Sequence, residues 1–126
     1  NIGMISRIES YKGQLDLIEG FAKLKLEDRE KLNVFFIGQG DDMEVKNLKN
    51  ILALKKIEKH FIFTGYLDYE SSSISSHLDL LISLTRTFEG FGLSIAEAMS
   101  TGTAVLATRV GAIPEYLNDS NSKNKK

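Results

Sequence analysis

A glycine-containing segment over residues 89–99 offers the most distinctive chemistry in the chain. It is Glu-Gly-Phe-Gly-Leu-Ser-Ile-Ala-Glu-Ala-Met, and we expect a helix to begin near Phe91. Gly90 and Gly92 remove side chains at this start, so a ligand can approach the backbone directly. The N–H groups of residues 91–94 have no partners within such a helix and suit a phosphate oxygen. The segment therefore predicts a site for an anion.

Two carboxylates flank the glycines. Glu89 precedes them, and Glu97 follows in the early turns of the expected helix. At the rise of a helix, the interval between the two spans about 12 Å. That length resembles the distance from a ribose to a hexose across a pyrophosphate, and carboxylates accept paired hydrogen bonds from vicinal hydroxyls. The alternative makes Glu89 a turn residue and Glu97 a solvated helix position.

Arg7 and Lys12 follow the first apolar run of the chain. Lys12 stands where a helix is expected to start, and a positive charge there opposes the helix dipole. A bound diphosphate would compensate both charges, meeting Arg7 as a bidentate fork and Lys12 as a point charge. Taken alone, these two residues favour the alternative, which is a pair of solvated surface cations.

Other polar groups predict less. Residues 38–40 follow an expected strand but lack the third glycine of a dinucleotide-binding fingerprint. A helix-start turn capped by Asp41 is the better interpretation. His60 and His77 are isolated in the sequence and lack the spacing of metal ligands, so no metal site is predicted.

The elements that position these residues show two alternating apolar patterns. Short, nearly all-apolar runs indicate strands buried on both faces, at residues 2–6, 33–38, 60–64, 78–83 and 104–108. Helical spacing lies between them, at residues 13–26, 43–55, 68–76 and 91–100. Together they predict an α/β fold, a Rossmann-like three-layer sandwich with a parallel sheet of about five strands. With strand order 3-2-1-4-5, the loops after the first and fourth strands flank one crevice, where such sheets bind ligands.

Length and composition limit the function classes. The 126 residues fit one domain, which we expect over residues 1–117 and truncated at both ends, followed by a polar, disordered tail over 118–126. A net charge of −1 argues against a nucleic-acid binder, which needs a basic face. No apolar run approaches the roughly 20 residues of a membrane span. Without cysteines there is neither a disulfide framework nor a thiolate metal site.

The interval from Glu89 to Glu97 resembles the E-x7-E motif of retaining nucleotide-sugar glycosyltransferases. Residues 6–13, 36–40, 61–65 and 104–115 are similar to the family's other blocks, in the same order, and together with the motif they are spread over most of the range 2–117. Three departures stand out. Residues 84–88 replace a common Pro-Ser before the first glutamate, Ala104 replaces a proline, and Ala112 replaces a glycine.

This resemblance implies roles for individual residues. Arg7 and Lys12 would hold the donor diphosphate and Glu89 would contact the donor sugar, which makes these three the expected catalytic residues. The remaining donor-binding residues are Gly90, Phe91, Gly92, Leu93 and Ser94 against sugar and phosphate, Glu97 on the ribose hydroxyls, and Leu67 beside the base.

The resemblance also implies a reaction. The chain would be the C-terminal, donor-binding half of a GT-B enzyme that moves a sugar from a UDP- or GDP-sugar to an acceptor hydroxyl with retention of anomeric configuration. No cofactor or metal would be required. A saccharide or lipid-linked acceptor would bind through a missing N-terminal domain, so the chain alone would be inactive. The implied location is the cytoplasm, with a peripheral position at the inner membrane face as a variant.

Two other function classes stay open. A nucleotide-sugar epimerase or a phosphorylase of the same architecture would keep the fold and change the reaction. A non-enzymatic α/β module, such as a receiver domain, fits less well, because Ser6 and Arg7 follow the first strand where a receiver has an acidic pair.

Overall fold

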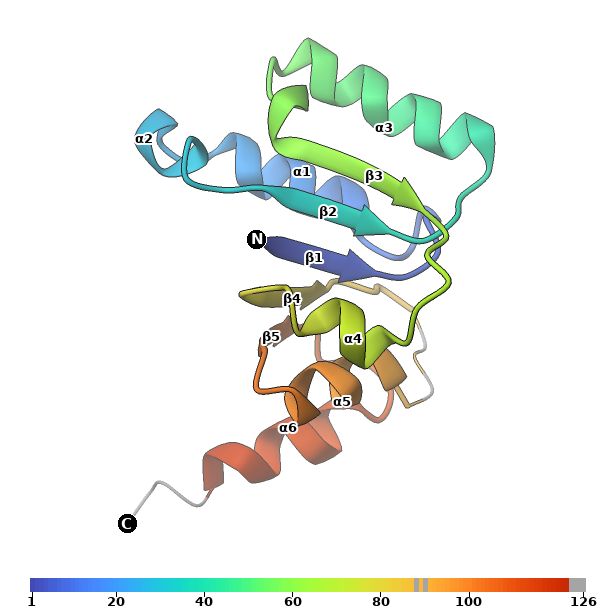
Figure 1. The fold of residues 1–126 in the computed structure, drawn as a ribbon, viewed down its shortest axis with the longest axis vertical. Helices are drawn as coiled ribbons and strands as arrows, with labels where there is room; N and C mark the ends of the chain where they lie inside the picture. The colour runs from blue at the N-terminus through green and yellow to red at the C-terminus, as the bar shows by residue number, and fades with distance from the viewer. Residues whose placement is uncertain (88, 90, 123–126) are drawn as a thin grey trace.

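The chain forms a parallel sheet of five strands, in a computed structural model that describes residues 1–87, 89 and 91–122. The strands are β1 (Ile2–Ile5), β2 (Val34–Ile37), β3 (Phe61–Gly65), β4 (Leu80–Ser83) and β5 (Ala104–Ala107). Their order in the sheet is β3-β2-β1-β4-β5 (Figure 1), which confirms the predicted arrangement. All four neighbouring pairs are parallel.

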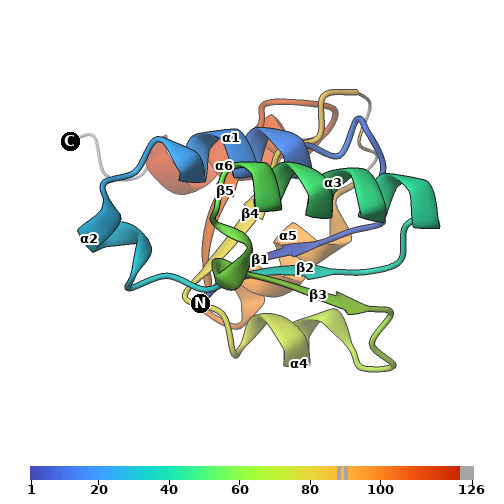
Figure 2. The same cartoon turned by 90° about the horizontal axis from the view of Figure 1, so that it is seen from above.

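Helices cover both faces of this sheet. They are α1 (Gln14–Ala22), α2 (Leu26–Arg29), α3 (Asp42–Leu54), the 3-10 turn η1 (Glu58–His60), α4 (Ser71–Ser75), α5 (Leu93–Ser100) and α6 (Ile113–Ser122). Figure 2 shows α1 and α3 on one side of the sheet and α4 and α5 on the other. The fold is therefore the predicted Rossmann-like α/β sandwich.

The first expected helix, over residues 13–26, ends earlier than its apolar spacing indicates, and a separate short helix follows it. Helix α1 ends at Ala22, and α2 begins only after Lys25, whose backbone is extended at φ −64° and ψ 150°. The guanidinium of Arg29 closes the gap by donating hydrogen bonds to the carbonyl oxygens of Ala22 and Leu24. The apolar spacing over residues 13–26 did not indicate this break, because it arises from a side chain of the following helix.

Helix α6 runs past residue 118, where the polar tail is expected to begin. Its backbone is helical as far as Ser122, and residues 123–126 lie outside the described part. Pro114 lies in the first turn, where its fixed φ favours a helix. Ile113 anchors that turn because it is almost fully buried. The polar residues that follow extend this helix without an apolar stripe, so periodicity could not predict them.

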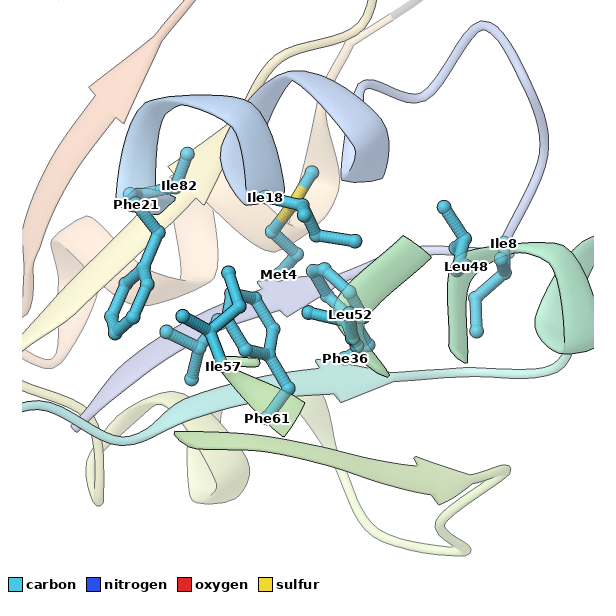
Figure 3. Close-up of a cluster of buried hydrophobic side chains, with 11 residues drawn as sticks. Met4, Ile8, Ile18, Phe21, Phe36, Leu48, Leu52, Ile57, Phe61 and Ile82 are labelled. Carbon is cyan, nitrogen blue, oxygen red and sulfur yellow. The ribbon is translucent and has the colours of Figure 1, made fainter. Parts of the chain in front are cut away.

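The larger apolar cluster fills the space between the sheet and the helices α1 and α3 (Figure 3). Ile18 of α1 and Leu52 of α3 meet Phe36 of β2, an interior strand next to β1, and each of the three side chains is at most 1% exposed. Burying a side chain of this kind completely contributes about 1.5–3 kcal/mol relative to leaving it exposed.

A second apolar cluster lies on the opposite face. It joins Leu81 of β4 to Ile95 and Ala98 of α5 and to Ile113 of α6. The next residue along β4, Ile82, belongs to the first cluster, as the alternation of side chains along a strand requires. The strand is thus apolar on both faces, and α5 and α6 are attached to the same part of the sheet.

Candidate functional site

The carboxyl ends of β1 and β4 lie side by side at one edge of the sheet (Figure 1). A crevice of about 350 Å³ opens there, lined by the end of β1, the loop after it, the end of β4 and the start of α5. The predicted site residues that line it are Arg7, Lys12, Glu89, Phe91, Gly92, Leu93 and Ser94. The fold thus brings the two candidate loops to one crevice; Gly90 lies outside the described residues.

The loop after β1 rests against the loop after β2. The Ile8 N–H donates to the Gln39 carbonyl at 2.7 Å, and the Ser6 N–H donates to the carbonyl at the end of β2 at 3.0 Å. Gly38 makes this approach possible: its φ is +143°, and a Cβ there would lie 2.1 Å from the Ser6 carbonyl oxygen. The loop that carries Arg7 is therefore fixed from this side by backbone contacts.

The same loop is fixed from the other side by the segment after β4. The Arg86 N–H donates to the Tyr11 carbonyl at 2.8 Å, and the Arg86 guanidinium pairs with Asp16 of α1. Gly13 starts α1 with φ +91°, and a Cβ there would lie 2.4 Å from the Leu84 carbonyl oxygen. These contacts place the residue before Gly13, which is Lys12, at the wall of the crevice.

Gln14 is a polar residue of the site region that the sequence did not reveal. It is the first residue of α1 and only 2% exposed. Its Nε2 donates to the Arg7 carbonyl at 3.0 Å and to Ser6 Oγ at 3.2 Å, while its Oε1 is buried without a hydrogen-bond partner. A buried amide directed at the Arg7 backbone stabilises the loop conformation. Nothing in a lone glutamine at a helix start indicates this contact in advance.

Lys12 and Glu89 form an ion pair across the crevice. Lys12 Nζ lies 3.3 Å from Glu89 Oε2, and the two side chains are 17% and 25% exposed. Partial burial strengthens this pair relative to one in open solvent. The same ammonium lies 5.3 Å from the centre of the Tyr11 ring. The crevice therefore presents a positive and a negative group next to each other.

Arg7 is held more loosely than Lys12. Its guanidinium pairs with Glu9 at 3.1 Å, but the Arg7 side chain is 72% exposed. The Glu9 carboxylate also raises the pKa of Tyr11, mainly through a hydrogen bond from the phenol. Since exposed ion pairs are weak, the guanidinium can turn toward an anion in the crevice at little cost.

The N-terminus of α5 points its free backbone donors at this crevice wall. Gly92 precedes the helix with φ +69°, and no side chain caps it. The amides of Leu93 and Ser94 therefore stay available at the positive end of the helix dipole. The segment has the geometry expected of an anion site, with the two cations of the β1 loop beside it.

Tyr116 of α6, which does not line the crevice, contacts the segment before α5. Its hydroxyl donates to the Phe91 carbonyl at 2.8 Å, and the two rings lie 5.6 Å apart at 34°. Burial raises the pKa of Tyr116, and the negative charge of Glu89 raises it further. This contact was not predicted, because Tyr116 belongs to a helix that apolar periodicity did not indicate.

Leu67 lies outside the crevice, in an adjoining hollow of about 510 Å³. Ile5, Ser6 and Arg7 line both spaces, so the two adjoin. Tyr66, the other candidate neighbour in this loop, also lines the hollow. Leu67 therefore lies in the space next to the crevice, on the other side of Arg7.

Glu97 does not line the crevice. It lies four residues after Leu93 in α5 and hence on the same helical face, one turn further along. Because α5 begins only at Leu93, the helical rise applies to just the second half of the interval from Glu89 to Glu97. The expected 12 Å separation therefore does not follow from helix geometry.

The part of the chain that the structure describes contains no group of three or more histidine, aspartate or glutamate side chains that could hold a metal ion. Within the same residues, no helix combines the length and the apolar character that crossing a bilayer requires.

Comparison with protein families gives one match over almost the whole chain. The family model described as "Glycosyl transferases group 1" matches residues 1–124. A relative from Bacillus anthracis, N-acetyl-alpha-D-glucosaminyl L-malate synthase, is 32% identical over 90% of this chain and 28% of its own length. The poly(glycerol-phosphate) alpha-glucosyltransferase of Bacillus subtilis is 36% identical over 82% of this chain and 15% of its own.

Solved structures of other proteins are also similar to this chain. Anabaena Alr3699/HepE, crystallised with UDP and glucose, superposes with a TM-score of 0.81 at 26% identity, over 90% of this chain and 30% of that one. The C-terminal domain of the group 1 glycosyl transferase LpcC from Francisella tularensis gives 0.76 at 32% identity, over 90% of this chain and 60% of that one. The chain thus spans less than a third of the B. anthracis and Anabaena proteins.

Proposed function

Because this chain belongs to the glycosyl transferases group 1 family, we propose that it is the donor-binding part of a glycosyltransferase. The reaction moves a sugar from a nucleoside diphosphate sugar to an acceptor hydroxyl and retains the anomeric configuration. One observation carries the proposal: Arg7, Lys12, Glu89 and the uncapped start of α5 line a single crevice at the carboxyl ends of β1 and β4.

In this proposal the diphosphate occupies the crevice. Arg7 and Lys12 bind its oxygens, and the amides of Leu93 and Ser94 add donors at the positive end of α5. As the bond to the sugar breaks, negative charge develops on the leaving diphosphate, and these fixed groups stabilise it. These groups supply the positive charge that a divalent cation supplies in metal-dependent enzymes. The proposal therefore includes no metal and no cofactor.

Glu89 receives the donor sugar in the same proposal. Its carboxylate faces the crevice beside Lys12 and accepts hydrogen bonds from sugar hydroxyls. Phe91 and Gly92 form the adjoining backbone, where the lack of a side chain on Gly92 leaves room for the sugar. Gly90, outside the described residues, is a further proposed contact. The three charged groups Arg7, Lys12 and Glu89 are the proposed catalytic residues.

The nucleoside extends from the crevice past Arg7. Leu67 borders the base, which is supported by the position of its hollow next to the crevice, with Arg7 lining both. Glu97 binds the ribose hydroxyls from the exposed face of α5, one turn beyond Leu93. We propose uridine as the nucleoside, since the Anabaena relative was crystallised with UDP, and guanosine as the alternative.

The acceptor binds elsewhere in the proposed enzyme. The relatives are more than three times as long as this chain, which leaves space in them for a second domain that holds a saccharide or lipid-linked acceptor. We propose that such a domain is needed for turnover and that the enzyme works in the cytoplasm, in contact with the inner membrane face when its acceptor is a lipid.

Calorimetric titration with UDP tests the proposal. The chain should bind UDP with one-to-one stoichiometry and unchanged affinity in the presence of EDTA, and measurable transfer to a soluble acceptor should be absent. Lack of saturable binding of both UDP and GDP would contradict the proposed function. Loss of binding on chelation would contradict the metal-free site.

A further inference from the structure

The segment that carries the start of α5 is supported by residues that do not line the crevice. Gly111, between β5 and α6, has φ +58°, and a Cβ on it would lie 1.8 Å from the Glu89 carbonyl oxygen. Tyr116 contacts Phe91 through both its hydroxyl and its ring. The segment following β5 therefore fixes the backbone of the crevice wall at two points, Glu89 and Phe91.

The hydrogen bond from Tyr116 determines the orientation of one peptide plane. In a trans peptide the C=O and the following N–H point in opposite directions. With the Phe91 carbonyl directed at the Tyr116 hydroxyl, the N–H of Gly92 must point away from α6. Gly92 lines the crevice and Tyr116 does not, so this N–H lies on the side where a ligand would bind.

The contact depends on glycine at position 92. A Cβ on Gly92 would lie 2.8 Å from the Tyr116 hydroxyl oxygen, and the φ of +69° is unfavourable for other residues. Burial and the charge of Glu89 both raise the pKa of Tyr116, so its hydroxyl stays protonated and able to donate at neutral pH. The bond is therefore present under the conditions in which a donor would bind.

We propose that Tyr116 is a positioning residue for donor binding, acting through the Phe91 carbonyl to direct the Gly92 amide into the crevice. This inference rests on the proposed function of the crevice. It assigns to α6 a role in binding, although none of the α6 side chains that the structure describes, those of residues 113–117, lines the crevice.

A matched pair of substitutions separates positioning from general stabilisation. Tyr116→Phe removes the hydroxyl and keeps the ring against Phe91. Thr108→Val removes a hydroxyl that donates to the Thr85 carbonyl at 2.7 Å. Thr85, like Phe91, lies in the connection between β4 and α5, but neither Thr85 nor Thr108 lines the crevice. Each variant loses one hydroxyl-to-carbonyl hydrogen bond, so the losses in stability should be similar.

Calorimetry with UDP and amide NMR spectra provide the readouts. Tyr116→Phe should weaken UDP binding by about three- to tenfold, the range expected for one hydrogen bond. It should also move the Gly92 and Leu93 amide resonances of the unliganded protein. Thr108→Val should leave UDP affinity and both resonances unchanged.

The possible results are distinct. Equal UDP affinity in the wild-type chain and Tyr116→Phe overturns this inference and leaves the proposed function intact. Equal weakening by both substitutions also overturns it, because general loosening then explains the effect. A wild-type chain that binds neither UDP nor GDP overturns the proposed function and this inference with it. If Tyr116→Phe does not fold, Gly92→Ala, which pushes on the same hydroxyl, must weaken UDP binding more than Thr108→Val does.

Discussion

The Lys12 ammonium lies 3.3 Å from the Glu89 carboxylate, although 77 positions separate the two residues in the chain. In the unliganded crevice each charge is therefore neutralised by the other. A diphosphate must compete with Glu89 for Lys12. A sugar hydroxyl, in contrast, can bind Glu89 while the ion pair between Lys12 and Glu89 stays in place. Substitution of Glu89 should thus affect the binding of the diphosphate and the binding of the sugar in different ways.

Glu89→Gln should leave UDP affinity unchanged or raise it several-fold, because the variant removes the negative charge that competes for Lys12. Any gain in affinity of UDP-glucose over UDP should disappear, since an amide cannot accept paired hydroxyl bonds as a carboxylate does. Glu97→Gln, the matched carboxylate-to-amide change, should instead weaken UDP itself. Calorimetry with both ligands measures this, and a tenfold loss of UDP affinity in Glu89→Gln would contradict the assignment.

Arg7→Ala should weaken UDP binding by about tenfold or more, because a charge-assisted hydrogen bond contributes roughly 1.5–3 kcal/mol. Its stability should change little, since the guanidinium is mostly exposed and its ion pair with Glu9 is weak. Arg109→Ala is the control: Arg109 follows β5, is exposed and does not line the crevice. Similar UDP affinities in the two variants would mean that Arg7 has no special role.

Gly13→Ala should destabilise the fold by at least about 1–2 kcal/mol, the cost of a left-handed conformation for a residue with a Cβ. The contact with the Leu84 carbonyl adds to this cost. Gly20→Ala should have the opposite sign and stabilise by about 0.5–1 kcal/mol, because Gly20 lies within α1 and a Cβ there meets no atom within 4 Å. Urea unfolding compares the two variants, and a neutral Gly13→Ala would show that the loop geometry is wrong.

Stability should fall at alkaline pH in a way that depends on Tyr116. Its pKa in the folded chain is raised by burial and by Glu89, so the folded state holds this proton more tightly than the unfolded state. The resulting stabilisation is complete below the unfolded pKa, about 10, and is lost as pH rises through the folded value. Subtracting the unfolding free energy of Tyr116→Phe from that of the wild type isolates the contribution of this proton to stability. A difference that grows above pH 10 would contradict the direction of the shift.

The sequence predicted both the sheet and the approach of Arg7, Lys12 and Glu89 to one another, because both follow from the order of the parallel strands. Buried apolar runs gave the strands, and the strand order placed both loops at one carboxyl edge. Gln14 and Tyr116 could not be predicted in this way. Each acts through a single hydrogen bond to a backbone carbonyl, of Arg7 and Phe91 respectively, and such contacts leave no periodic pattern.

The positions of Glu97 and Leu67 show a second limit. Spacing predicted a helical separation of Glu97 from Glu89, but α5 starts only at Leu93, so the helical rise does not set the distance between the two. Leu67 lies beside the crevice and not in it, at a distance that depends on the conformation of the loop after β3. Loop geometry of this kind depends on contacts between distant segments, which a single sequence does not specify.

Titration of the isotopically labelled chain with UDP, followed by amide and arginine side-chain NMR, tests the central claim most directly. The account predicts the largest saturable shifts at the amides of Leu93 and Ser94 and at the Arg7 Nε–H, with smaller ones at Leu67. Shifts confined to the opposite end of the strands, or to α2 and α3, would contradict it.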